Sequence, residues 1–315
     1  MSNQINHTPA YRIKTVASMT GLSTHLIRKW EERYHLVRPQ RGPNGYRTFT
    51  EDDVQFLLYL KSQLTHGETI GQLAQSGVTQ LRQAMRAFSY SCSGIPNQFQ
   101  LESRKLIESA QNKDYDAIQK TIASWILQLG LEEAMEVILF PLLRLIGELW
   151  HQGRISISAE NSMSRIVRQQ LINALGKNLS AGPERALIAC VPGDNHEIAP
   201  LTATLLLQKR GWQATYLGPN VSFEVLQVAL RRRHADLMII ASTTEPDVQT
   251  GRSWIETMAH TFQPQCRVIA GGAGFRAFSA LLAQYGITYL KQVKEVMGLD
   301  PTTSPSSNLG MLTRS

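Results

Sequence analysis

Asp194 and His196, two residues apart, are the side chains of this sequence best suited to hold a metal. A neutral histidine nitrogen is a good ligand, and a carboxylate on the other ring nitrogen fixes the tautomer and orientation of the imidazole. An apolar run, residues 186–191, precedes the pair, and a helix-like stretch, residues 198–210, follows it. A loop histidine alone is more often simply solvated, so the prediction of a ligand depends on what surrounds it.

Two later loops also follow apolar runs and carry small polar residues or glycines. Ser242 and Thr244 come after residues 237–241, whereas Gly271 and Gly272 come after residues 268–270. The alternation of apolar runs and helical stretches predicts an α/β domain with a parallel sheet. In such a sheet all three loops lie at the carboxyl ends of the strands, the edge where ligands bind.

In this order, the Asp-x-His, Ser-x-Thr and Gly-Gly sequences resemble the cobalamin-binding domain of methionine synthases, corrinoid proteins and cobalamin-dependent mutases. The resemblance implies a flavodoxin-like (Rossmann-like) domain over residues 184–299. It implies His196 as the lower axial ligand of cobalt and Asp194 as the partner that orients it. The remaining contacts, to the nucleotide tail of the cofactor, fall on the later loops: Ser242, Thr244, Gly271 and Gly272. Ala199 stands where the family has a glycine, and its methyl group leaves weakened or lost binding open.

Most of the positive charge lies near the beginning of the chain. The net charge is +7, and residues 11–47 contain eight basic and two acidic side chains. Such a patch is typical of nucleic-acid binding. A short helix over residues 13–20, a turn at Gly21 and a second helix capped by Ser23 or Thr24 predict a helix-turn-helix. The second helix has an apolar stripe, which we expect to be buried: Leu26, Ile27 and Trp30.

A basic hairpin, residues 37–49, follows with a turn at Pro43-Asn44-Gly45, and Thr50 to Asp53 resembles a capping box. Helix, turn and wing together resemble the winged-helix domain of MerR-family regulators over residues 11–77, within a domain that we place at 11–88. The resemblance implies that Arg28 and Arg47 hold phosphates. It implies that Thr24, His25 and Lys29 face base edges. The predicted DNA-binding residues are Thr24, His25, Arg28, Lys29, Arg33, Arg41, Tyr46 and Arg47. Without the wing, the basic residues of the second helix would be interpreted only as a solvent-exposed helix face.

Helical periodicity continues over residues 98–180 after a small, polar linker at 89–97. Four helices in this length predict a small bundle, with one apolar run interrupted at Pro141. A long dimerisation helix after the wing is not expected, because Gly71 and Gly77 interrupt residues 68–86.

Trp150-His151 is followed, nine positions after the histidine, by Glu160-Asn161. This pattern resembles the bundle that caps the cofactor in light-sensing cobalamin regulators of the CarH/CarA type. The resemblance implies that Trp150 covers the upper face of the corrin and that Glu160 contacts the adenosyl group. It implies His151 as the upper ligand of cobalt after that group has left. The family has Glu-His where this chain has Glu160-Asn161, so the upper contacts stay open, and core packing is the plain alternative for Trp150.

Other classes of protein are disfavoured. Three widely spaced cysteines indicate a reducing cytoplasm rather than a disulfide framework or a zinc finger: Cys92, Cys190 and Cys266. Residues 1–10 are polar and read as a flexible N-terminus rather than a signal peptide, and residues 300–315 as a disordered tail. No apolar run approaches the roughly 20 residues that span a bilayer. No catalytic triad or phosphate loop is recognised, so we do not expect an enzyme.

The combined prediction is a multidomain α and α/β protein: winged helix, four-helix cap and cobalamin-binding domain. It implies a light-responsive transcriptional repressor with adenosylcobalamin as chromophore. A dark homo-oligomer (dimer or tetramer) would bind double-stranded operator DNA, and light would dissociate it. Alternatives are another cobalamin form, a bilin, or a cofactor-free repressor controlled by a protein partner. A corrinoid methyl carrier is disfavoured because the DNA-binding head has no use there. Operator, target genes and the sign of regulation are not predicted.

Overall fold

The structure, a computed structural model, falls into two compact units, residues 1–166 and 167–315. It describes residues 11–41, 45–65, 68–86, 92, 94–175 and 182–299. Four predicted segments lie outside the described residues: the flexible N-terminus, the disordered tail, residues 43–44 of the wing turn, and residues 89–91 and 93 of the expected linker.

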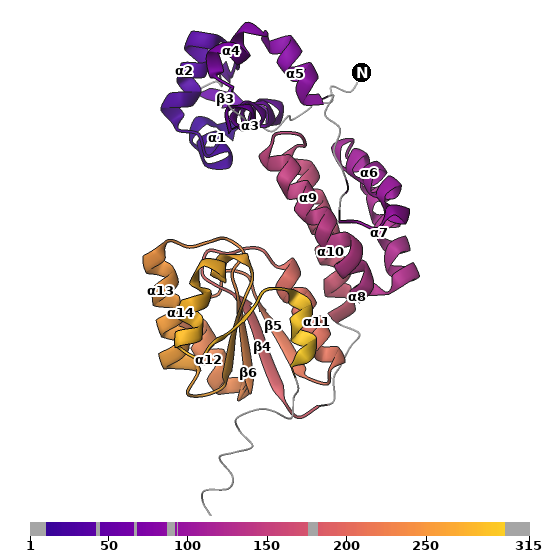
Figure 1. Cartoon of the computed structure of the whole chain (residues 1–315), viewed down its shortest axis with the longest axis vertical. Coiled ribbons are helices and arrows are strands. Elements are labelled where there is room, and N and C mark those ends of the chain that lie inside the picture. The colour runs from indigo at the N-terminus through magenta and orange to yellow at the C-terminus, as the bar shows by residue number, and fades with distance from the viewer. Residues whose placement is uncertain are drawn as a thin grey trace, which may run out of the picture. The chain divides into compact units, whose positions relative to one another are not determined.

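The first unit begins with a winged helix (Figure 1). Its elements are β1 (Tyr11–Arg12), α1 (Ile13–Thr20), α2 (Thr24–Tyr34), β2 (Gln40–Arg41), β3 (Arg47–Phe49), α3 (Glu51–Thr65), α4 (Ile70–Gln75) and α5 (Val78–Arg86). The strands form an antiparallel sheet in the order β1-β3-β2. Gly21, in the left-handed region at φ +64°, ends α1, and the Ser23 hydroxyl accepts from Leu26 N to begin α2. The predicted helix-turn-helix and wing are therefore present.

The core of the winged helix contains the predicted stripe of α2. Ile27 and Trp30 are fully buried with Val16, Leu36 and Phe49, whereas Leu26 is half-buried. Thr50 and Asp53 form the expected capping box, with backbone N–H to side-chain bonds of 3.1 Å in both directions. Gly77 separates α4 from α5 as expected.

One expectation about this region is wrong. Gly71 was expected to interrupt the helical stretch, but it lies inside α4. The N-terminal cap at Thr69, whose side chain pairs reciprocally with Gln72, starts the helix one residue before the glycine and supports it.

Four helical stretches follow as predicted. They are α6 (Asn97–Gln111), α7 (Tyr115–Leu129), the run of α8 (Leu131–Ala134), the π-helical η1 (Met135–Leu139) and α9 (Phe140–His151), and α10 (Ile157–Leu175), which crosses the boundary between the units. The expected interruption at Pro141 does not occur. Pro141 lies in the first turn of α9, directly after the π-helical turn, where a missing N–H does least harm. Trp125 of α7 is buried and donates from Nε1 to Glu102 Oε2 of α6 at 2.6 Å.

The second unit is a doubly wound α/β domain. Its elements are β4 (Arg185–Cys190), α11 (Ile198–Lys209), β5 (Gln213–Gly218), α12 (Phe223–Arg233), β6 (Leu237–Ala241), α13 (Val248–Thr257), η2 (Met258–Phe262), β7 (Arg267–Gly271), η3 (Ala273–Phe278), α14 (Ser279–Gln284), β8 (Thr288–Leu290) and η4 (Val293–Gly298). All neighbouring strands are parallel, in the order β5-β4-β6-β7-β8. This is the flavodoxin-like order, and its switch point lies between β4 and β6.

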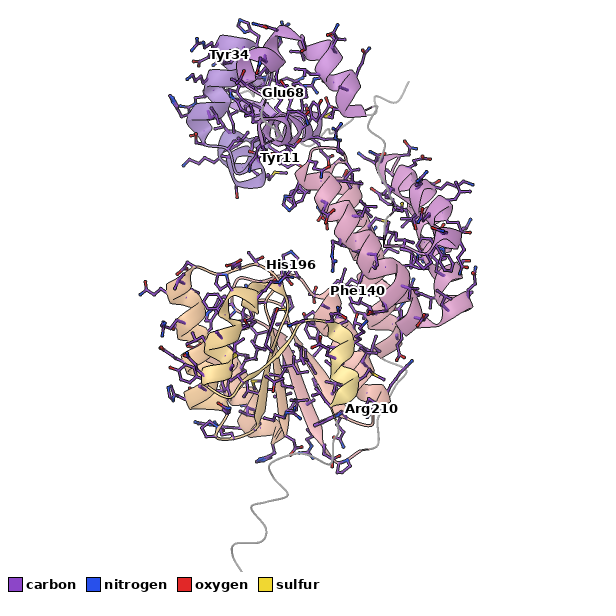
Figure 2. All side chains as sticks on the ribbon, in the orientation of Figure 1. Tyr11, Tyr34, Glu68, Phe140, His196 and Arg210 are labelled. Atoms are coloured by element: carbon purple, nitrogen blue, oxygen red, sulfur yellow. The ribbon has the colours of Figure 1, made fainter. Side chains whose placement is uncertain are left out.

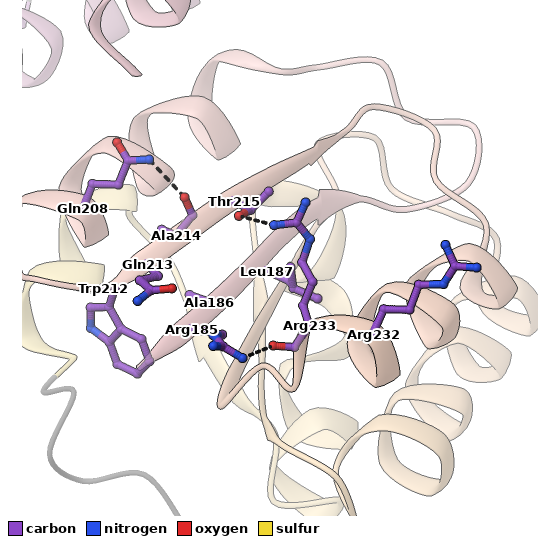
Figure 3. A pocket seen from close by; sticks show the side chains of 10 residues that line it. All are labelled: Arg185, Ala186, Leu187, Gln208, Trp212, Gln213, Ala214, Thr215, Arg232 and Arg233. Carbon is purple, nitrogen blue, oxygen red and sulfur yellow. Dashed lines mark hydrogen bonds between the residues drawn. The ribbon is translucent and has the colours of Figure 1, made fainter. Parts of the chain in front are cut away.

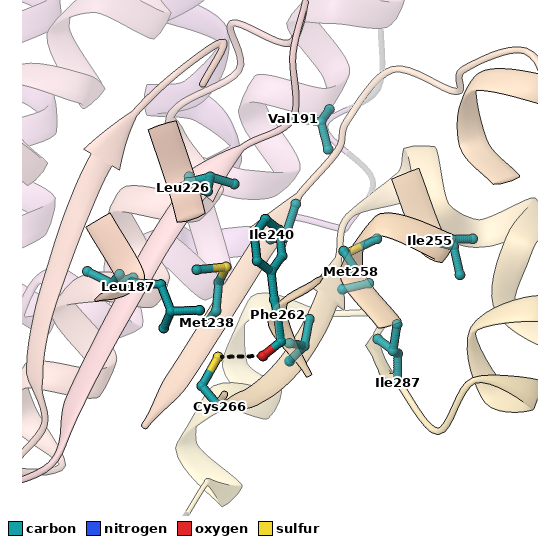
Figure 4. Close-up of a cluster of buried hydrophobic side chains, with 14 of the residues drawn as sticks. Leu187, Val191, Leu226, Met238, Ile240, Ile255, Met258, Phe262, Cys266 and Ile287 are labelled. Carbon is teal, nitrogen blue, oxygen red and sulfur yellow. Dashed lines mark hydrogen bonds between the residues drawn. The ribbon is translucent and has the colours of Figure 1, made fainter. Parts of the chain in front are cut away.

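Both faces of this sheet are covered, which explains why β4 is apolar at nearly every position. Helix α11 and the turn η4 pack on one face with Ala186 and Ile188. Helices α12, α13 and α14 lie on the other face (Figure 1), where Leu187, Met238 and Ile240 pack with Phe262 (Figure 4). The loops after β4, β6 and β7 are therefore left at the carboxyl edge.

Candidate functional site

The loop after β4 is organised around the Asp194 carboxylate, whose side chain is 3% exposed. Asp194 Oδ1 accepts from the backbone N–H of His196 at 2.9 Å and lies 2.7 Å from His196 Nδ1. Its Oδ2 accepts from the backbone N–H of Thr243 and, at 3.4 Å, from that of Thr244. One carboxylate thus orients the histidine and ties together the two loops that flank the switch point.

These contacts also set the charge of Asp194. Burial alone would raise the pKa of the carboxyl group, but the bonds from the His196 side chain and from the Thr243 and His196 N–H groups outweigh it, and the pKa lies below its ordinary value. The carboxylate therefore stays ionised and can hold a proton on His196 Nδ1. Nε2 is then the nitrogen that a metal would take.

His196 is held at one nitrogen but is not buried. Its side chain is 62% exposed, and it projects from the loop edge of the sheet (Figure 2). The predicted pair is therefore brought together at the carboxyl edge, with the imidazole largely exposed to solvent. In the part of the chain that the structure describes, no group of three or more His, Cys, Asp or Glu side chains forms a metal site.

The loops after β6 and β7 meet as expected, but mostly through each other's backbone. Ser242 is fully buried, and its hydroxyl donates to Thr244 O at 2.9 Å. A Cβ on Gly272, at φ +97°, would collide with Ser242 O, whereas one on Gly271 would meet nothing within 4 Å. Thr244 is exposed. Gly272 is thus needed for the contact between the loops, and Gly271 leaves open space beside them.

Sequence reasoning missed two residues that fix this edge. Asn220, in the left-handed region at φ +48°, accepts from Gly193 N at 2.7 Å and donates its own N–H to Asp194 O at 2.8 Å. Thr243 holds Asp194 through its backbone N–H, a role that any residue type can fill. Asparagine tolerates a left-handed turn, so a turn at 219–220 was the only available signal.

A second missed feature is a polar chain beside the histidine loop. The Cys190 thiol donates to His196 O and lies near Tyr216 Oη, both at 3.6 Å. Tyr216 Oη donates to Glu197 Oε1 at 3.3 Å, and Glu197 forms an ion pair with Arg168 of α10. Burial raises the pKa of the Cys190 thiol to about 11, so the thiol stays neutral. This series of side chains supports the loop through two contacts of the neutral thiol, one hydrogen bond to the Glu197 carboxylate and one ion pair.

Ala199, where the resemblance expects glycine, lies in the first turn of α11 and is exposed. Its methyl group therefore lies at the surface of the carboxyl edge. Crowding of a bound tail by this methyl group stays a prediction.

The four candidate residues of the bundle lie at the ends of α9 and α10. The Trp150 and His151 rings are 4.5 Å apart between centroids, and His151 is exposed. Trp150 is partly buried against the core of the winged helix. Glu160 accepts from the Ser164 hydroxyl at 2.8 Å, and Asn161 is exposed. The structure thus gathers these residues around one turn of the first unit.

The basic side chains of α2 form the candidate DNA-binding face. Those exposed on this helix are His25, Arg28, Lys29 and Arg33, while Thr24 is half-buried at its start. From the wing, Arg41 and Tyr46 are also exposed, the latter 63%. Trp30 lies in the core, as expected. These six exposed side chains have the accessibility that a DNA contact requires.

Arg47 differs from the other basic residues because it is already paired. Its Nε lies 2.7 Å from Glu31 Oε2, and its Nη2 lies 3.4 Å from Glu32 Oε1. The pair joins the wing strand β3 to α2 and so fixes the position of the wing against the recognition helix. A phosphate contact by Arg47 stays a prediction.

The arginine run at the end of α12 lies at the opposite, amino edge of the sheet. There a hollow of about 420 Å³ is bordered by Arg185, Arg232 and Arg233 (Figure 3). Arg185 donates to Arg233 O at 3.0 Å, and Arg233 donates to Thr215 Oγ1 at 3.3 Å. This basic hollow lies across the domain from His196 and takes no part in the candidate cofactor site.

The comparisons with known proteins agree with this architecture. The family model described as MerR HTH family regulatory protein matches residues 11–76. The HTH-type transcriptional repressor CarH of Myxococcus xanthus is 28% identical over 287 residues, which cover 88% of this chain and 93% of the relative. The HTH-type transcriptional repressor CarA of the same organism is 27% identical over 297 residues, which cover 91% of this chain and 95% of the relative.

Among solved structures, the monomethylamine corrinoid protein of Methanosarcina barkeri matches with 14% identity and a TM-score of 0.48, over 62% of this chain and 94% of that chain. No helix in the described part of the chain is long and apolar enough to cross a membrane. From the sequence comparisons, the chain has a MerR-type helix-turn-helix domain and is homologous to the repressors CarH and CarA over about 90% of its length.

Proposed function

We propose that the chain is a DNA-binding transcriptional repressor that uses adenosylcobalamin as a light-sensitive chromophore. Residues 11–88 would bind operator DNA, residues 98–180 would cap the cofactor and residues 184–299 would hold it. The observation that carries the proposal is the Asp194–His196 pair: a buried carboxylate presents an exposed imidazole at the switch point of a doubly wound sheet. The names of CarH and CarA support the regulatory part.

The residues present fit a corrinoid. A corrin brings its own nitrogen ligands for cobalt, so a single histidine of the chain would suffice to hold it, and no larger ligand cluster is needed among the described residues. The open space at Gly271 gives a tail room beside the backbone. When bound, adenosylcobalamin supplies a cobalt–carbon bond that visible light can break.

The side chains of this chain have separate parts in the proposal. His196 would bind cobalt through Nε2 while Asp194 keeps the proton on Nδ1. Trp150 and Glu160 would cover the other face of the cofactor, and His151 is the candidate second ligand. Ser242, Thr244 and Asn161 are further proposed contacts to the cofactor. The chain departs from the family pattern at Asn161 and Ala199.

Homo-oligomerisation would convert cofactor binding into DNA affinity. Several winged helices in one oligomer engage neighbouring half-sites, and such multivalency raises apparent affinity about 10²–10⁴-fold without a new base contact. Dissociation in light would lose this gain.

The test follows absorbance and size together. The full chain is mixed with adenosylcobalamin in darkness, desalted, and examined by absorbance and size-exclusion chromatography before and after green illumination. We expect a retained corrin spectrum, a larger dark species and a smaller illuminated one. His196→Ala should lose both responses, whereas His260→Ala, at an exposed histidine of the same unit, should keep them. A colourless wild-type protein, or an unchanged response in His196→Ala, would overturn the proposal.

A further inference from the structure

The turn between α9 and α10 packs against helix α3 of the winged helix. Gly153 is buried at φ +66°, and a Cβ there would overlap the backbone of Gln55 and lie 2.9 Å from Tyr59 Cα. Ser62 Oγ lies 3.5 Å from Gln152 O. Only glycine allows so close an approach in this conformation. The two backbones are therefore in direct contact.

Arg154, the next residue, joins this turn to two helices of the winged helix. Its guanidinium lies over the Tyr59 ring, 4.6 Å from the centroid, in a cation–π contact. Nη1 also donates to Ala84 O at 3.0 Å and Met85 O at 3.3 Å, at the C-terminal end of α5. A cation at this end is favourable for the helix dipole and satisfies terminal carbonyls. One side chain thus holds α3 and α5 to the turn.

A third contact joins the start of α10 to the base of the wing. Glu51, the first residue of α3 and two residues after β3, accepts the backbone N–H of Ser158 through Oε1 at 2.7 Å. A carboxylate at the first turn of α10 is favourable, because the first N–H groups of a helix have no partner within it. The turn therefore contacts α3 and α5, while the basic side chains project from α2.

The same turn carries the residues proposed to cover the cofactor. Trp150 and His151 end α9, and Glu160 lies in the first turn of α10. The Trp150 indole packs on the core of the winged helix, and its Nε1 is buried with no hydrogen-bond partner among the described residues. A side chain expected to contact a cofactor is thus in contact with the DNA-binding domain.

We propose that the α9–α10 turn is a coupling element, through which occupancy of the cap sets the position and rigidity of the winged helix. This inference rests on the proposed function, since it assigns the cofactor to the cap. It adds an intramolecular route to the loss of avidity, because the winged helix of each protomer would respond to its own cap. By linkage, the coupling acts equally in both directions, and such couplings are typically about 5–150-fold in affinity.

The experiment measures backbone hydrogen exchange of the full chain by mass spectrometry at residues 51–62 and 78–86. It compares wild type, Arg154→Ala and the control Arg144→Ala, an exposed arginine of α9. Without cofactor, we expect exchange in both segments to be about tenfold faster in Arg154→Ala than in Arg144→Ala. Equal exchange would overturn the docking. Should Arg154→Ala fail to fold, Glu51→Gln, which weakens the bond to Ser158 N, takes its place.

A second arm adds adenosylcobalamin in darkness. In wild type and Arg144→Ala the cofactor should change exchange in both segments at least fivefold, and in Arg154→Ala this change should be largely lost. An equal change in all three would overturn the coupling. A wild-type protein that stays colourless after desalting would overturn the proposed function and the coupling with it, whereas the docking is judged by the cofactor-free arm alone.

Discussion

Replacing Asp194 by asparagine keeps the size of the side chain but removes its charge and one of its two acceptor oxygens. The wild-type carboxylate accepts from the N–H groups of His196, Thr243 and Thr244 and from the His196 ring. An amide NH₂ must face one of these sets of donors. If the NH₂ group faces His196 Nδ1, this nitrogen becomes an acceptor and the ring proton moves to Nε2. A protonated Nε2 cannot bind a metal.

The magnitude follows from these contacts. A hydrogen bond to a charged group contributes about 1.5–3 kcal/mol, and Asp194 is too buried for water to replace the lost acceptor. We expect Asp194→Asn to lower the free energy of unfolding by about 2–4 kcal/mol. Loss of the partner of a metal-binding histidine typically costs 10–100-fold in affinity, about 1.4–2.7 kcal/mol.

The assay is a dark absorbance titration with adenosylcobalamin, paired with urea unfolding of the cofactor-free protein. Asp247→Asn is the matched control: this exposed aspartate caps α13 of the same unit and also has a pKa below its ordinary value, because it accepts from Thr250. The control should keep wild-type cobalamin affinity. An Asp194→Asn protein with wild-type affinity would refute the assignment of Asp194 as the partner of a ligand.

The depressed pKa of Asp194 also predicts a pH dependence. A carboxyl group whose pKa is lower in the folded state stabilises the fold above its unfolded pKa, about 3.9, and loses this effect as the pH falls through the folded value. The difference in unfolding free energy between wild type and Asp194→Asn should therefore shrink as the pH falls below about 4. A difference that grows as the pH falls from about 4 to about 2 would contradict the sign.

Two further predictions concern the loops and the DNA face. Gly272→Ala should lower the free energy of unfolding by about 2–4 kcal/mol, because the methyl group meets Ser242 O at a positive φ. Gly271→Ala should lower it by less than about 1 kcal/mol, because its methyl group meets nothing. Urea unfolding of both variants tests this difference. On a duplex of fixed length, Arg28→Ala should reduce the slope of log K against log salt by about 0.9, the value of one phosphate contact. If Arg47 only ties the wing to α2, Arg47→Ala should leave that slope unchanged. If Arg47 also holds a phosphate, the slope should fall by the same amount as in Arg28→Ala.

The sequence allowed the elements and their order to be predicted where local rules agree. Ser23 and Gly21 delimit α2 and α1, and apolar runs directly before Asp194, Ser242 and Gly271 mark strands buried on both faces. The carboxyl-edge site followed from topology alone, since parallel strands place such loops together. Gly71 and Pro141 misled because a capping box and a π-helical turn compensate locally for poor helix formers.

The rest depends on contacts between distant segments. That Gly153 must be glycine follows from the approach of α3, roughly a hundred residues earlier in the chain, and no local pattern announces it. The resemblance to MerR-family regulators implies that Arg47 holds a phosphate, and this stays a prediction. Its ion pair with Glu31 depends on the folded wing and could not be read from the sequence. Thr243 holds the Asp194 loop through its backbone N–H, which any residue type supplies and which the sequence therefore conceals. Asn220 acts through its side-chain oxygen as well as its backbone N–H, and only a turn at 219–220 pointed to it.

The most direct test of the central claim is electron paramagnetic resonance of the Co(II) form of cobalamin bound to protein labelled with ¹⁵N-histidine. If His196 binds cobalt from below, the superhyperfine splitting should change from the triplet of ¹⁴N to the doublet of ¹⁵N, and His196→Ala should abolish the doublet. A triplet that persists in the labelled protein would mean that the cofactor keeps its own base as ligand, and His196 would not be the axial ligand.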